Sequence, residues 1–161
     1  MTIRSLTASV ICLAAVIVSS AAQATDYQSG YGALQVFDDA AMQSLPPWLK
    51  VWLVILLTSF AAGLFFVWNH PIARWVVGGL IATMVVVEGL APALGIPVVS
   101  GFLSLCHLAF WSPGLYLLLR ERPFLGKITA FSIWSGIMTA VILFSFVFDI
   151  RDALIYLRHL I

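Results

Sequence analysis

Charged residues are scarce in this chain of 161 residues. They form 9% of the sequence and hydrophobic residues form 62%, whereas a soluble domain carries about 25% charged residues. So few charges leave too little polar surface to face water, and we therefore expect lipid to surround much of the chain. The eight basic residues are scattered rather than clustered, which excludes the basic face of a nucleic-acid-binding protein.

Cysteine and catalytic motifs are scarce as well. Cys12 lies in a segment that we expect to be removed, which leaves Cys106 alone and excludes an internal disulfide. The sequence contains no CxxC, GxSxG, HExxH, P-loop or GxGxxG motif. The histidines are expected at three depths, so they cannot share one metal ion: His70, His107 and His159. We predict a protein that is not an enzyme and that holds no metal or cofactor.

The first 24 residues have the pattern of a secretory signal peptide. Arg4 gives a basic start, an apolar run follows, and Ala22 and Ala24 are small residues before Thr25. We expect cleavage after Ala24, so that the mature chain begins outside the cytoplasm. A retained first transmembrane helix is the alternative, and it leaves the following residues on the same side.

Four apolar runs are each long enough to cross about 30 Å of hydrocarbon. Because backbone polar groups in lipid must be paired within their own segment, each run is expected to be a helix. The sequence therefore predicts an all-α fold, a four-transmembrane-helix bundle behind the signal peptide. The transmembrane domain covers residues 49–148, and its predicted helices are 49–68, 72–90, 98–119 and 128–148.

Loop charges give the direction of threading. The connections 68–74 and 120–127 hold four basic residues, and the opposite side of the mature chain holds three basic residues and five acids. Basic residues favour the cytoplasmic side, and this small bias agrees with the exported start. We predict that both mature ends lie outside the cytoplasm and that the protein is in a bacterial inner membrane.

Short segments at both mature ends have one apolar helical face each. Residues 25–48 and 149–161 are predicted to hold amphipathic helices that lie on the outer membrane surface. In the first, the apolar face consists of Leu34, Phe37, Ala41 and Leu45. Such helices anchor the ends of the chain, and partner binding is the alternative.

Small residues four positions apart predict where helices pack closely, because they let two backbones approach in lipid. The second predicted helix has Gly78 and Ala82, and the fourth has Ser132, Gly136 and Ala140. The pattern leaves open whether the opposing helix belongs to this chain or to another one. Besides the lipid bilayer, we therefore expect protein partners or self-association through transmembrane helices.

Three residues interrupt the apolar spans. A carboxyl at the bilayer centre costs about 2.5–3.5 kcal/mol, so Glu88 is expected to face protein or water. The hairpin between the second and third helices predicts a structural hydrogen bond between Glu88 and His107. A proton or cation site, a ligand or cofactor site, and an unpaired Glu88 are the alternatives. Pro113 is predicted to kink the third helix and to free the carbonyl of Ala109, which Ser112 can satisfy.

The absence of a catalytic set and the small-residue stripes favour a non-catalytic subunit or assembly factor of a larger membrane complex. The alternative is a small oligomeric proton- or ion-linked transporter or channel that uses Glu88 and His107. Few polar residues are available to line a path through the membrane, which places transport second. A membrane-embedded enzyme is the third interpretation.

Overall fold

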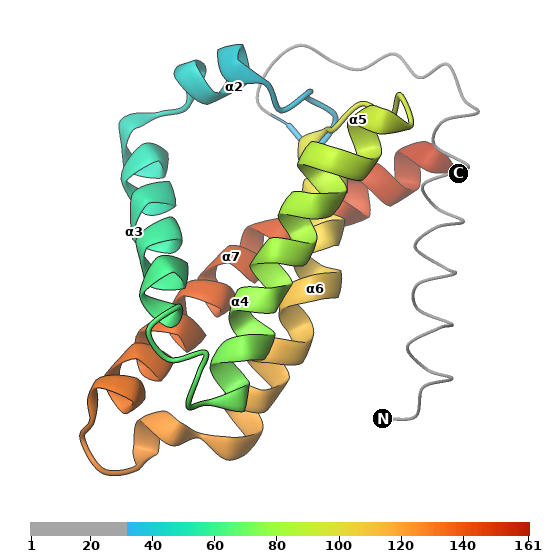
Figure 1. Ribbon diagram of the computed structural model, residues 1–161. Coiled ribbons are helices and arrows are strands. Elements are labelled where there is room, and N and C mark those ends of the chain that lie inside the picture. Colours follow the sequence, from blue (N-terminus) through green and yellow to red (C-terminus); the bar gives the residue numbers. More distant parts are fainter. Residues whose placement is uncertain (1–31) are drawn as a thin grey trace, which may run out of the picture.

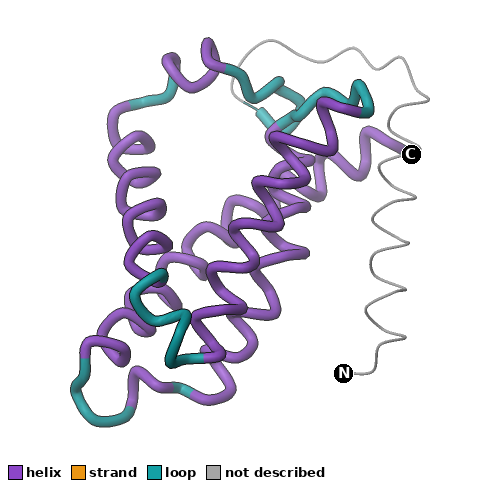
Figure 2. Tube along the Cα trace, viewed as in Figure 1, coloured by secondary structure: helices purple, strands orange, loops and turns teal. Residues whose placement is uncertain are grey.

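The computed structural model describes residues 32–161, and the regular structure in this range is helical (Figures 1 and 2). This confirms the all-α prediction, while the predicted signal peptide, residues 1–24, lies outside the described residues. An isolated antiparallel bridge joins Val36 to Val99. The elements in chain order are α2 (Asp39–Ser44), α3 (Pro47–Gly63), α4 (Pro71–Met84), the π-helix η1 (Val85–Leu90), α5 (Ala91–Ala93), α6 (Ser100–Glu121), the 3-10 helix η2 (Pro123–Leu125) and α7 (Ala130–Leu160).

Three helical stretches are long and apolar enough to cross a membrane: Pro71–Ala93, Ser100–Leu125 and Ala130–Leu160. They are consistent with an integral membrane protein. The four-helix count is not confirmed, because α3 has 17 residues and reaches only about 25 Å at 1.5 Å per residue. The predicted span 49–68 ends early because its last residues form tight turns, with the amide of Leu64 donating to the carbonyl of Ala61 at 3.1 Å.

The second predicted helix, 72–90, extends to Ala93 and changes its hydrogen bonding on the way. In η1 the backbone widens into a π-helix, and the amide of Ala91 donates to the carbonyl of Val86. Pro92 follows, and its ring would clash with the carbonyl of Glu88, four positions earlier, in a regular α-helix. The wider turn relieves that clash and carries the helix past the proline.

The fourth predicted span and the predicted C-terminal surface helix form one continuous helix, α7, of 31 residues. No break in the helix separates residues 148 and 149, where the sequence predicted the end of the transmembrane domain. The physical reason is that the chain has no proline and no glycine after Gly136 to stop the helix. The helix begins at a capping box in which Thr129 and Ser132 satisfy each other's backbone amides.

The predicted amphipathic helix within residues 25–48 is also shorter than expected. It covers only α2, which starts where the Asp38 carboxylate accepts from the amide of Ala41 at 2.8 Å. The residues before it, 32–38, form a turn and a short segment that lies against the start of α6 instead. The amides of Ser100 and Gly101 donate to the carbonyls of Gln35 and Ala33 at 2.9 and 2.7 Å. These bonds satisfy donors in the first turn of α6 that have no partner within the helix.

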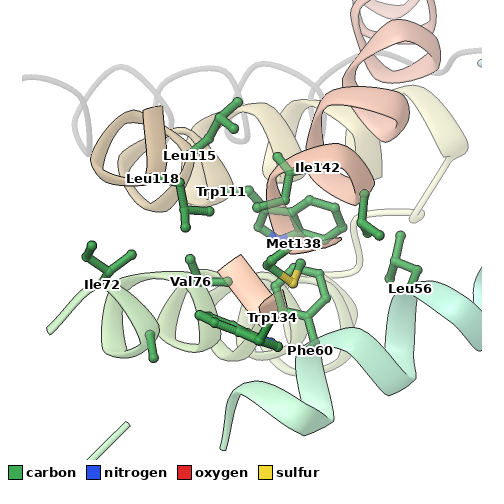
Figure 3. Packing of buried hydrophobic residues seen from close by; sticks show 12 residues of the cluster. Leu56, Phe60, Ile72, Val76, Trp111, Leu115, Leu118, Trp134, Met138 and Ile142 are labelled. Carbon is green, nitrogen blue, oxygen red and sulfur yellow. The ribbon is translucent and has the colours of Figure 1, made fainter. Parts of the chain in front are cut away.

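The core lies where α4, α6 and α7 pack against one another and against the C-terminal half of α3 (Figures 1 and 3). Phe60, Trp111, Met138 and Ile142 are almost fully buried there and come from three different helices. The indole N–H of Trp134 donates to the carbonyl of Ser59 at 2.9 Å and ties α7 to α3.

The close helix contacts are made at glycines other than those predicted. A Cβ atom added at Gly79 would lie 2.5 Å from the carbonyl oxygen of Phe110, and one at Gly114 would lie 2.9 Å from Val76 Cγ2. A Cβ atom at Gly78 would meet nothing within 4 Å. The stripe on α4 was thus predicted on the wrong face for packing within this chain, because Gly79, and not Gly78, lies on the side that meets α6.

The predicted stripe on α7 is only partly used within the chain. Ser132 is buried, Gly136 is half-buried and Ala140 is exposed. A Cβ atom at Gly136 would lie 3.3 Å from the Cβ atom of Phe124, in the segment before α7. Ala82, the second member of the α4 stripe, is half-buried. These residues therefore form no continuous seam between two helices of this chain.

Candidate functional site

His107 and Asp149 form a charged or polar pair between α6 and α7. His107 Nδ1 lies 3.1 Å from Asp149 Oδ1, and the two side chains are 19% and 11% exposed. An ionised carboxylate only accepts hydrogen bonds, so in that state Nδ1 carries the hydrogen. The two helices come close near this pair because Gly101 has no side chain: a Cβ atom there would meet Tyr156 Cβ and, at 2.8 Å, the carbonyl oxygen of Asp152.

The predicted pair of Glu88 and His107 is not formed. Glu88 is exposed on η1, and within the described part of the chain no hydrogen bond or ion pair joins it to His107. The side of α4 and η1 that packs into the protein is occupied by Thr83 and Val87, which are buried. Glu88 follows Val87 directly, so it is turned away from α6.

A chain of polar and aromatic groups continues from His107 to α4. The imidazole ring stacks on the indole ring of Trp111, with centroids 4.0 Å apart and an angle of 26° between the planes. The indole N–H of Trp111 donates to Thr83 Oγ1 at 3.2 Å. Thr83 in turn donates to the carbonyl of Gly79 at 3.0 Å. The orientation of His107 is therefore held from both sides, by a carboxylate on α7 and by a buried indole on its own helix.

The pair lines a cavity of about 350 Å³ between α3 on one side and α6 and α7 on the other. The α3 wall is apolar and contains two indole rings: Trp48, Leu49, Trp52, Leu53 and Leu56. The opposite wall carries the polar groups Ser104, His107, Ser145 and Asp149. In Figure 1, α3 stands apart from α4 and α6 at its N-terminal end, where Ala41 of α2 and residues before α2 also line the cavity.

Two buried polar atoms of residues that line the cavity have no partner among the described residues: Ser145 Oγ and Asp149 Oδ2. Both belong to well-buried residues, which are 7% and 8% exposed. A buried polar atom left without a hydrogen bond costs about 1–3 kcal/mol, and more when it is charged. One oxygen of Asp149 is thus satisfied by His107, and the other is an open acceptor.

Asp149, Ser145 and Ser104 were not predicted as site residues. The sequence analysis placed Asp149 on a separate surface helix, and it becomes a bundle residue only because α7 is continuous. A usable signal was present: Ser145 and Asp149 are four positions apart and so share one face of a helix. This pattern could have indicated that the hydrogen-bond partner of His107 lies on the fourth predicted span rather than on the second.

The other histidines and the proline singled out in the sequence are not part of this cavity. Pro113 lies inside α6, which continues through it, and Ser112 Oγ donates to the carbonyl of Leu108 rather than to that of Ala109. His70 stacks on Phe131, with ring centroids 3.6 Å apart, far along the chain from His107. Among residues 32–161, no three histidine, cysteine, aspartate or glutamate side chains gather in a way that suits a metal ion.

Comparison with known protein families, with curated proteins and with solved structures gives no match to this chain. The interpretation of its function therefore depends on the geometry of its own residues.

Proposed function

We propose that this protein is a non-catalytic subunit or assembly factor of a larger complex in a bacterial inner membrane. In this proposal the signal peptide is cleaved and both mature ends lie on the periplasmic side. The observation that supports it is the outer face of α4 and η1, which carries features of a packing surface that residues 32–161 leave uncovered.

Gly78 and Gly89 are exposed on that face, and a Cβ atom at either would meet nothing within 4 Å. Bare glycines let a second helix approach closely in lipid. Glu88 is exposed beside Gly89, inside the apolar span Pro71–Ala93. It lies about 8 Å from the end of the span at 1.5 Å per residue, where a carboxylate facing lipid is still unfavourable. A hydrogen-bond donor on a neighbouring chain would stabilise it.

The π-helical turn supports the same interpretation. Such turns are rare in α-helices and are frequent at functional sites. Here the turn holds both Glu88 and Gly89, and it places them outward while Val87 faces the core. We therefore propose that a transmembrane helix of a partner, with a donor side chain at this depth, packs on α4 and η1.

Native mass spectrometry of the protein, gently solubilised from the membrane of its own host, tests this proposal. Wild type is expected in an assembly heavier than one chain. Gly78→Leu is expected to lose the partner and keep its own thermal stability, because the glycine touches nothing among the described residues. Ala61→Leu, which introduces the same side chain at an exposed position of α3, is the control and should leave the assembly intact. A wild-type protein that travels as a single chain, or equal behaviour of the two variants, would contradict the proposal.

The His107–Asp149 pair favours a second candidate, a small oligomeric proton- or ion-linked transporter or channel. Histidine is the side chain that changes its charge near neutral pH, and paired ionisable groups within spans mark proton relays. Asp149 takes the place that the sequence analysis assigned to Glu88. Proton flux into proteoliposomes separates the candidates: transport predicts that Asp149→Asn abolishes flux and that Glu88→Gln preserves it, whereas an assembly factor shows no flux in any form.

A further inference from the structure

We infer that the cavity between α3, α6 and α7 binds a primary ammonium group carried on an apolar body. Among the described residues, none from α4 or η1 lines this cavity, so the inference does not depend on the proposed partner. It starts from one incomplete interaction, the single hydrogen bond of the Asp149 carboxylate.

The chemistry of the polar wall requires a hydrogen-bond donor. Asp149 Oδ2 is a buried acceptor without a partner among residues 32–161, and Ser145 Oγ, one helical turn earlier, is a second polar atom in the same state. A neutral donor would satisfy one of these atoms. An ammonium group has three N–H donors and also compensates the carboxylate charge, which is costly to bury alone. Ser104 lines the same wall and offers a third oxygen.

The other wall suits an apolar and aromatic body. Trp48 and Trp52 line it together with leucines of α3. Indole faces attract cations within about 6 Å, and leucine side chains favour hydrocarbon over a charged or strongly hydrated ligand. The volume of about 350 Å³ is at the lower end of the range for small-molecule sites, about 300–1,000 Å³. An amine with a ring or a short chain fits these walls better than an inorganic cation.

Access to the carboxylate requires a movement of one wall, because Asp149 Oδ2 is fully buried. The helix suited to that movement is α3. Its hydrogen bond to α7, from Trp134 to the carbonyl of Ser59, lies at its C-terminal end, beyond the residues that line the cavity. The N-terminal half of α3 also meets α7 through the rings of Trp52 and Phe144, whose centroids are 4.4 Å apart. An outward shift of this half breaks that ring contact and leaves the core around Phe60 packed.

The charges around the cavity favour a cation. Two carboxylates, Asp149 and Asp152, and one guanidinium, Arg151, belong to the lining, together with the imidazole of His107. With His107 neutral these groups sum to one negative charge. Asp149 is the more buried of the two carboxylates, and its Oδ2 atom has no partner among the described residues.

The test compares two probes of the same shape, 4-fluorobenzylamine and 4-fluorobenzyl alcohol, by fluorine NMR titration. The full mature protein is used in phosphatidylcholine nanodiscs, and empty discs give the background of lipid partitioning. Wild type is expected to bind the amine at least tenfold more tightly than the alcohol. Equal binding of the two probes, or binding of neither above the background, would overturn the inference without any variant.

Variants locate the site. Asp149→Asn is expected to weaken amine binding at least tenfold and to leave alcohol binding unchanged, and Glu88→Gln, an acid outside the cavity, should change neither. Ser145→Ala keeps the carboxylate and should weaken amine binding about three- to tenfold. This variant tests the site if Asp149→Asn does not fold. Trp52→Leu should weaken both probes, because it removes part of the apolar wall. Full amine binding by folded Asp149→Asn and by Ser145→Ala would refute the assignment.

The same ammonium chemistry is found in lipid headgroups and in soluble amines. Adding phosphatidylethanolamine to the discs distinguishes them, because its headgroup is a primary ammonium and that of phosphatidylcholine has no N–H donor. Competition with 4-fluorobenzylamine identifies a lipid headgroup as the occupant, and unchanged amine binding identifies a soluble amine.

Discussion

Replacing Gly79 by alanine should destabilise the protein, whereas the same change at its neighbour Gly78 should not. The two glycines are adjacent and both are helical residues of α4, but Gly79 is buried and Gly78 is exposed. A Cβ atom at Gly79 would lie 2.5 Å from the carbonyl oxygen of Phe110 and 3.1 Å from its carbonyl carbon, and one at Gly78 would meet nothing within 4 Å.

The magnitude follows from two opposing terms. Alanine is favoured over glycine within a helix by about 0.5–1 kcal/mol, and Gly78→Ala gains this in full. At Gly79 the obstacle is backbone of α6 rather than the flexible end of a side chain, so the two helices must separate. Overpacking of this kind costs about 1–3 kcal/mol. We expect a net loss of up to about 2 kcal/mol for Gly79→Ala.

The assay is unfolding of both variants and wild type in the same detergent, followed by tryptophan fluorescence and by circular dichroism. The core between α4 and α6 contains Trp111, whose Cδ1 atom would lie 3.4 Å from the added methyl group, so its emission should report the separation of the helices. If Gly79→Ala is as stable as Gly78→Ala, the close approach of α4 and α6 is wrong, and with it the hydrogen bond from Trp111 to Thr83.

Three further results are expected. Reporter fusions should be active on the cytoplasmic side at Gly126 and on the outer side after Ile161, and a cytoplasmic C-terminus would reverse the threading. Gly136→Leu should lower the melting temperature, because the first atom added already lies 3.3 Å from Phe124. Leu143→Ile, at a position 44% exposed, should change the melting temperature little. Equal melting temperatures of the two variants would contradict this. Thr83→Val should cost about 1–3 kcal/mol because it leaves a buried indole N–H unpaired, and Thr83→Ser should restore most of it; a Val variant as stable as wild type would show that this hydrogen bond contributes little.

The composition predicted segments that suit a membrane, but the sequence predicted the ends of the helices less accurately. The second and third predicted spans, 72–90 and 98–119, agree with helices in the structure apart from a few terminal residues. The first was predicted too long, because residues 64–68 remain apolar while they form turns. Hydrophobicity indicates which residues can face lipid. It does not indicate whether a backbone amide donates its hydrogen bond to the carbonyl three or four residues earlier, which decides where the α-helix ends.

The partner of His107 illustrates the limit at the site. The sequence analysis singled out His107 and Glu88 because polar residues in apolar spans are costly. It paired them because the second and third predicted helices are consecutive and form a hairpin. The structure pairs His107 with Asp149, 42 positions away. That choice depends on the rotation of α4 and α6 about their axes, which a hydrophobic pattern does not specify when nearly every face is apolar.

The sequence by itself determined that this protein is helical, that it has segments suited to lipid, and that few residues in those segments can do chemistry. These properties follow from composition and run length, because lipid leaves a backbone few alternatives to the helix. Only the tertiary structure decided that α7 continues unbroken to bring Asp149 beside His107, that Gly79 rather than Gly78 meets the next helix, and that α3 stands off to leave a cavity. Each of these depends on contacts between distant residues, where differences of an ångström in side-chain volume select one packing among several that the apolar pattern permits equally.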